Sequence, residues 1–195
     1  KYFSSAAMIE AVGAVITIPV MWYLFHRDRV KERQMGIIPN KKAAFWKYAA
    51  GLLMAAALSL GLNNLIIIGN LSVMSESYEA TMDILYSAPL MVQIISLAVL
   101  VPVSEELVFR GLLFKRLRER GTYIQAALYS SVVFGIMHGN LIQILYGFTL
   151  GMMLSYLCEK YGSVIAPIAA HIVMNLLSVL ATEYNLADWM MESNM

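Results

Sequence analysis

Residues 88–114 read APLMVQIISLAVLVPVSEELVFRGLLF, an apolar run that is interrupted by Glu105, Glu106 and Arg110. About 20 mostly apolar residues are enough for one membrane crossing. Ionisable side chains inside such a run are costly in hydrocarbon, and they mark a functional site by default. Later apolar segments carry further polar residues of this kind, namely His138, His171 and Asn175. The sequence therefore predicts an active site within the bilayer.

The composition of the chain agrees with a membrane protein. Of its 195 residues, 59% are hydrophobic and only 14% are charged, which is too apolar for a soluble domain of this length. The net charge of +1 gives no indication of a nucleic-acid partner. The single cysteine, Cys158, excludes an internal disulfide, and a lone cysteine near a helix end is more typical of packing than of a thiol nucleophile.

The distribution of apolar segments predicts an all-α fold, a polytopic transmembrane helical bundle of about six spans. These spans are 4–25, 48–70, 88–110, 122–139, 141–158 and 163–182. The third is expected to continue as a helix through Arg118 and to turn near Gly121. No repeat or low-complexity linker divides the chain, so 1–195 is expected to be a single domain. A further helix before Lys1 is left open.

The basic residues gather in connections that this topology places on one side of the membrane. Seven lie between the first two spans, four follow the third span, and Lys160 follows the fifth. The connection between the second and third spans instead carries Glu76, Glu79 and Asp83. By the positive-inside rule the basic loops are predicted to be cytoplasmic, in what we expect to be a prokaryotic cell membrane.

The spacing of the polar residues suggests that they meet. Glu106 and Arg110 stand at i and i+4, which allows a carboxylate and a guanidinium to pair along one helix face. Glu105 points about 100° away from Glu106 and can face a different cavity. Glu105 and His138 are almost equally far in sequence from Gly121, so two antiparallel helices joined there would bring them to the same depth. A common polar layer is the prediction.

The same i, i+4 spacing relates three further pairs of residues. They are Phe134 and His138, His171 and Asn175, and the two glycines Gly147 and Gly151. The glycine pair forms a Gly-x-x-x-Gly pattern, which is typical of closely packed membrane helices. We interpret it as a packing feature.

Three strings occur in order on the predicted helices: EExxxR at Glu105–Arg110, FxxxH at Phe134–His138 and HxxxN at His171–Asn175. Together they resemble the CPBP family, the CAAX proteases and bacteriocin-processing enzymes, which include the type II CAAX prenyl endopeptidases. The resemblance covers about 88–182, and the first two spans match only as generic membrane helices. It implies that 1–195 is a membrane-embedded, protease-like domain with intramembrane endopeptidase activity.

The resemblance also implies roles for the motif residues. Glu105 would be the general base that activates water, and His138 its partner in holding that water. His171 and Asn175 would stabilise the oxyanion of the tetrahedral intermediate, and Glu106 with Arg110 would support Glu105. Elementary chemistry agrees, because peptide hydrolysis needs a base beside a water and donors aimed at the developing oxyanion.

The sequence leaves the question of a metal open. Glu105, His138 and His171 would suffice for a three-ligand zinc site with a fourth position for water. The same residues serve equally well in a glutamate-dependent site without metal. No cofactor is firmly predicted.

The expected partners are the lipid bilayer and a peptide or protein substrate. In a prokaryote a leader peptide, a peptide pheromone or a bacteriocin precursor is a more plausible substrate than a prenylated protein. The alternative is a non-catalytic bacteriocin-immunity protein or membrane scaffold, but degenerate members would be expected to lose the motif glutamate or histidines. A small transporter would be expected to show repeated halves, which the sequence lacks.

Overall fold

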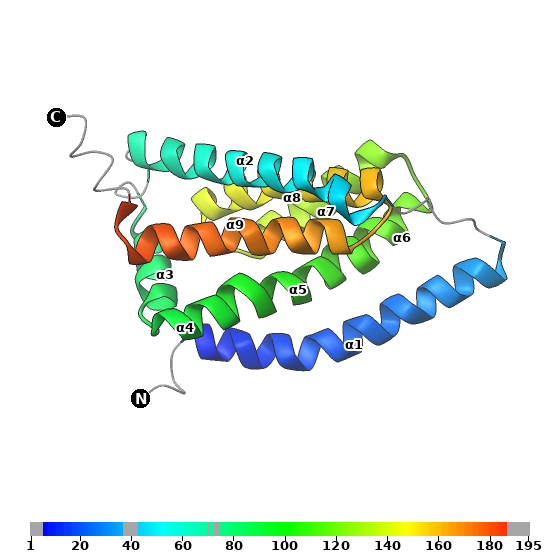
Figure 1. Cartoon of the computed structure of the whole chain (residues 1–195), viewed down its shortest axis with the longest axis horizontal. Helices are drawn as coiled ribbons and strands as arrows, with labels where there is room; N and C mark the ends of the chain where they lie inside the picture. The colour runs from blue at the N-terminus through cyan, green and yellow to red at the C-terminus, as the bar shows by residue number, and fades with distance from the viewer. Residues whose placement is uncertain (1–5, 37–42, 70, 72–74, 187–195) are drawn as a thin grey trace.

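The computed structural model describes residues 6–36, 43–69, 71 and 75–186, and these parts of the chain contain helices and no β-strand (Figure 1). The predicted all-α membrane bundle is confirmed. Five helices are long and apolar enough to cross a membrane. They are α1 (Ala6–Gln34), α2 (Tyr48–Ile68), a continuous helix over Leu90–Arg118, α8 (Leu141–Tyr161) and α9 (Ile165–Glu183).

The expected span over 122–139 is shorter than predicted. Its helix, α7 (Tyr123–Ile136), has 14 residues and measures about 21 Å at 1.5 Å per residue. A capping box between Thr122 and Gln125 fixes its start. Its end comes early because the chain turns before Gly139, whose φ of +82° suits a residue without a side chain. His138 therefore lies in the turn after α7 rather than on the helix.

Helices α7 and α8 form a tightly packed antiparallel hairpin. Asn140 begins α8 by accepting a hydrogen bond from the Gln143 backbone N–H at 2.9 Å. A Cβ added to Gly135 would lie 2.6 Å from the Ile144 carbonyl oxygen, and one on Gly147 would lie 3.3 Å from the Gly135 Cα. The two backbones thus meet at glycines, as the Gly-x-x-x-Gly pattern predicted.

The Leu90–Arg118 helix contains two π-helical segments, η3 (Ile94–Leu100) and η4 (Leu107–Phe114). Between α4 (Leu90–Gln93) and α6 (Lys115–Arg118), they flank α5 (Val101–Glu106), which ends with the two motif glutamates. Such widened turns are rare and frequently occur at functional sites. Hydropathy does not reveal them, and the apolar pattern predicted a regular α-helix over this stretch.

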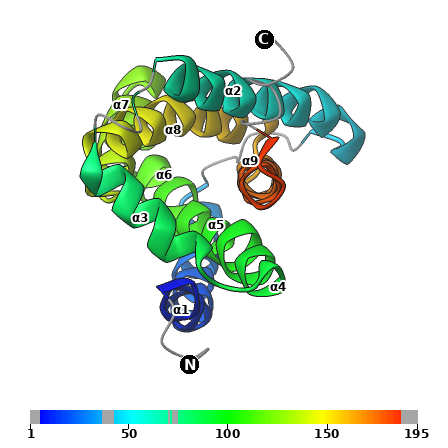
Figure 2. The ribbon, with the colours of Figure 1, turned by 90° about the vertical axis from the view of Figure 1, so that its left-hand side faces the viewer.

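The long helices alternate in direction, and the start of α1 and the end of α9 lie at the same end of the bundle (Figure 1). Seen end-on, α9 lies between α2 and the helix that contains α5 (Figure 2). A core of buried apolar residues joins α2, α8 and α9. Helix α1 is peripheral, and only about a tenth of its most apolar stretch is buried. A short helix, α3 (Glu76–Tyr86), crosses the end of the bundle, and a 3-10 turn, η2 (Phe45–Lys47), precedes α2.

Candidate active site

Glu106 and Arg110 form a completely buried ion pair. Both side chains are 0% exposed, and Arg110 Nη1 donates to Glu106 Oε1 at 2.8 Å. The pairing predicted from their spacing is confirmed. The other terminal nitrogen, Arg110 Nη2, donates to the carbonyl oxygen of Gly151 on α8 at 3.1 Å. The guanidinium therefore ties η4 to α8 and neutralises a carboxylate that would otherwise be very costly to bury.

Gly151, which the sequence pattern predicted only as a packing residue, contacts the Arg110 guanidinium. A Cβ at this position would lie 3.1 Å from Arg110 Nη2 and 2.9 Å from the Ser131 Cβ. A residue without a side chain is needed here because the guanidinium occupies that space. The glycine pattern was the only signal available, and it did not identify the arginine as the neighbour.

Phe134 is the aromatic centre of the cluster. Its ring centroid is 4.5 Å from Arg110 Cζ, and its ring packs edge-on against those of Phe109, His138 and His171 at centroid distances of 5.0, 4.9 and 5.8 Å. The side chain is 2% exposed. Phe134 thus contacts both histidines and the arginine. The face of its ring stabilises the guanidinium by a cation–π interaction.

His171 lies between the two glutamates. Its Nδ1 is 2.9 Å from Glu106 Oε1, and its Nε2 is 3.8 Å from Glu105 Oε2. The hydrogen bond to a carboxylate assigns a proton to Nδ1 and leaves Nε2 facing Glu105. The Glu105 side chain is 26% exposed, whereas that of Glu106 is fully buried. Of the adjacent carboxylates, Glu105 is therefore the one that can meet water or a ligand.

The remaining motif residues, His138 and Asn175, are connected less directly. His138 Nδ1 is hydrogen-bonded to the Phe134 carbonyl oxygen at 2.9 Å, so its Nε2 carries the free lone pair. His138 and His171 both pack against the Phe134 ring. His138 is also close enough to Glu105 for an electrostatic interaction. Asn175 Nδ2 donates to the Leu97 carbonyl oxygen in η3 at 2.8 Å. The sequence gave no signal for this bond, because nothing predicted the π-helical turn.

The residues as placed do not fit a zinc site. Among the described residues, no group of three or more His, Cys, Asp or Glu side chains is arranged to hold a metal ion. The Nδ1 atoms of both histidines are hydrogen-bonded, one to Glu106 and one to the Phe134 carbonyl. Metal-binding histidines commonly make such bonds with their second ring nitrogen, so it is the placement of the side chains that fails to fit a metal. No catalytic step is assigned to a metal on this arrangement.

The segment that contains this site is similar to a known family. Residues 87–177, which contain all six motif residues, match the family described as type II CAAX prenyl endopeptidase Rce1-like. The match agrees with the resemblance of this segment to the CPBP family. A relative from Bacillus subtilis (strain 168), named "Putative membrane peptidase YdiL", is 34% identical over 106 residues. Both comparisons thus show similarity to membrane peptidases.

The alignment with the Bacillus subtilis relative covers 54% of this chain and 43% of the relative. The chain therefore spans less than half of that protein's length. No solved structure matches the chain.

Proposed function

We propose that this protein is an intramembrane endopeptidase in which Glu105 activates water for the hydrolysis of a peptide bond. The supporting observation is the contrast between the two adjacent carboxylates. Glu106 is fully buried and held by Arg110 and His171, whereas Glu105 is partly exposed beside the free Nε2 of His171. One glutamate is suited to organise the site and the other to react.

In the proposed reaction, the Glu105 carboxylate takes a proton from a water molecule as the water oxygen attacks the carbonyl carbon of the peptide. The lone pair on His138 Nε2 accepts the second water hydrogen and so orients the nucleophile. When the tetrahedral intermediate collapses, the C–N bond breaks and Glu105 returns its proton to the leaving amine. The carboxylate is then regenerated for the next turnover.

The oxyanion would be stabilised by hydrogen-bond donors from α9. Glu106 accepts a hydrogen bond from His171 Nδ1 and fixes the orientation of the ring, so that in the proposed reaction Nε2 carries a proton and donates it in a hydrogen bond to the oxyanion. Asn175 has one amide hydrogen on the Leu97 carbonyl, which leaves the second for the oxyanion. Donors held in place in this way cost little reorganisation during the reaction.

The substrate would be a membrane-associated peptide or protein, such as a leader peptide, a pheromone precursor or a bacteriocin precursor. The predicted cytoplasmic ends of the helices are rich in lysine and arginine, which favours entry of the peptide from that side or laterally from the bilayer. The description of the matched family names a prenyl endopeptidase, but the proposed reaction at this site does not need a prenyl group on the peptide.

The test compares peptide termini by mass spectrometry in host membranes that carry either the wild-type protein or Glu105→Gln. Termini found only with the wild type would support proteolysis and identify the substrate. Identical termini, with both proteins folded and equally abundant, would overturn the proposal in favour of an immunity or scaffold role. A parallel sample treated with a zinc chelator tests the metal, because a glutamate-dependent site keeps its activity.

A further inference from the structure

Polar side chains continue along one face of α9 beyond the candidate active site. His171, Asn175, Ser178 and Thr182 follow one another at spacings of three and four residues, which keeps them on the same face of a helix. From first to last they extend over about 17 Å of helix axis. A face packed only against lipid or apolar side chains would not repeat polar groups in this way.

Two neighbouring helices add polar groups at the middle of this face. Asn63 Nδ2 on α2 donates to Ser178 Oγ at 3.4 Å, and the Tyr146 hydroxyl on α8 is 3.1 Å from Ser59 Oγ. Ser178 and Asn63 also lie near the Tyr146 hydroxyl. Ser59 is completely buried. Three helices therefore direct hydroxyl and amide groups toward one another inside the bundle.

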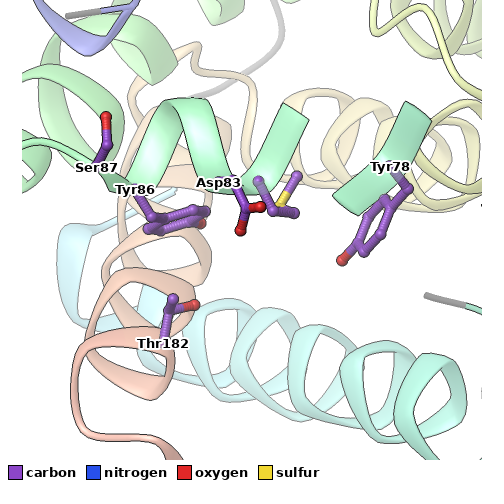
Figure 3. A pocket seen from close by; sticks show the side chains of 6 residues that line it. Tyr78, Asp83, Tyr86, Ser87 and Thr182 are labelled. Carbon is purple, nitrogen blue, oxygen red and sulfur yellow. The ribbon is translucent and has the colours of Figure 1, made fainter. Parts of the chain in front are cut away.

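At the far end the polar face of α9 reaches a cavity of about 250 Å³ beneath α3. Its lining residues are Tyr78, Met82, Asp83, Tyr86, Ser87 and Thr182. In Figure 3 the Asp83 carboxylate lies between the two tyrosine side chains, with Thr182 on the opposite wall. A space of this size with several polar lining groups is large enough for water molecules.

The two tyrosines of this cavity lie near Tyr146, which belongs to the polar groups deeper in the bundle. Burial raises the pKa of Tyr86 to about 12, and the nearby Tyr78 and Tyr146 hydroxyls act in the same direction. Burial also raises the pKa of Tyr78 above its usual value, again with Tyr146 close by. All three hydroxyls therefore lie within electrostatic reach of one another, and the two at the cavity stay neutral hydrogen-bond donors near neutral pH.

We propose that the polar face of α9 is a water passage, which supplies the water consumed in hydrolysis from the cavity beneath α3 to Glu105 and His171. The inference rests on the proposed function, because only a hydrolytic site within the bilayer needs this supply. Successive polar residues of α9 are about 4.5–6 Å apart along the axis. One or two waters bridge such a gap, since a buried water usually bonds about three polar partners.

Water fits these surroundings better than a peptide does. The groups along the face are small hydroxyls and amides, which can each bond to a water molecule. The peptide and the water would then reach the site from opposite ends of the bundle. In the proposed reaction this separation leaves the passage open while a substrate covers Glu105 from the other side.

The test measures the reactivity of single cysteines toward a small, charged, membrane-impermeant methanethiosulfonate that is applied to either side of sealed vesicles. The chain suits this method because its only cysteine, Cys158, is 2% exposed. Ser178→Cys should react from the cavity side. Val179→Cys is the matched control, since the neighbouring residue is 1% exposed in an apolar cluster and should not react. Leu60→Cys, on the outer face of α2, should also be protected by lipid.

A second variant tests whether the reagent enters through the cavity. Thr182→Trp places a bulky ring in the lining, and it should slow the labelling of Ser178→Cys by about tenfold as it displaces the waters there. Equal labelling of Ser178→Cys and Val179→Cys, or no effect of Thr182→Trp, would overturn the passage, provided that every cysteine reacts after denaturation. Labelling does not depend on proteolysis. A reactive Ser178→Cys with unchanged peptide termini would therefore reject the proposed function and keep the passage.

Discussion

The molecule contains two sets of ion pairs with nearly equal distances and very different surroundings. In the middle of the bundle, Arg110 Nη1 is 2.8 Å from Glu106 Oε1, and both side chains are 0% exposed. At the end of α6, Arg116 Nη2 is 2.7 Å from Asp28 Oδ2, with 47% and 15% of the side chains exposed. The N–O distances of the two pairs are nearly equal, and the pairs differ in how far their side chains are buried. The cost of removing one partner should therefore differ several-fold between them.

The largest effect is expected on activity, at the partly exposed member of the buried cluster. Glu105→Gln removes the proposed base while keeping the shape of the side chain, and it should lower hydrolysis by about 10²–10⁴-fold. Thermal unfolding should change little, because Glu106 rather than Glu105 holds the ion pair. Cleavage assays on purified protein would measure the loss, and retained turnover would contradict the role of Glu105 as the base.

The largest effect on stability is expected at Arg110. Arg110→Ala leaves Glu106 buried without its guanidinium, and breaking a buried pair in this way costs about 3–5 kcal/mol. Loss of the contacts with Gly151 and Phe134 adds to the damage. Denaturant unfolding in micelles would measure the change. A variant as stable and as active as the wild type would show that water reaches the pair.

The glycine beneath the arginine provides an intermediate effect. In Gly151→Ala the added Cβ would meet Ser131 Cβ at 2.9 Å and Arg110 Nη2 at 3.1 Å. Overpacking of this kind costs about 1–3 kcal/mol. The matched control is Gly13→Ala on α1, where nothing lies within 4 Å of the new Cβ. If both substitutions had the same effect on the unfolding free energy, the Arg110 guanidinium would not pack directly against Gly151.

The helical bundle, the buried ion pair and one of the turns were predictable from the sequence. The apolar segments predicted a helical bundle, and the i, i+4 spacing predicted the Glu106–Arg110 pair because helix geometry alone brings such residues together. The turn near Gly121 was also confirmed, since α6 ends at Arg118 and α7 begins at Tyr123. Local periodicity determines each of these features.

What the sequence did not predict depends on contacts between helices or on irregular turns. Hydropathy does not distinguish π-helical from α-helical turns, so η3 and its bond from Asn175 were missed. The early end of α7 follows from the chain turn near Gly139, which the apolar pattern did not reveal. The proposed roles of the motif residues, the substrate and the orientation in the membrane remain predictions.

The smallest effect is expected at the exposed pairs, where Arg116→Ala removes both nitrogens that contact Asp28. Solvent and salt screen this interaction, and exposed pairs are typically worth about 0.2–1 kcal/mol. The decrease in unfolding free energy caused by Arg116→Ala should become smaller still at about 1 M salt, where the screening length falls to about 3 Å. The decrease caused by Arg110→Ala should barely change. Unfolding free energies of both variants at low and high salt provide the measurement. If both variants showed the same salt dependence, burial would not explain any difference in stability between the ion pair of Arg116 and that of Arg110.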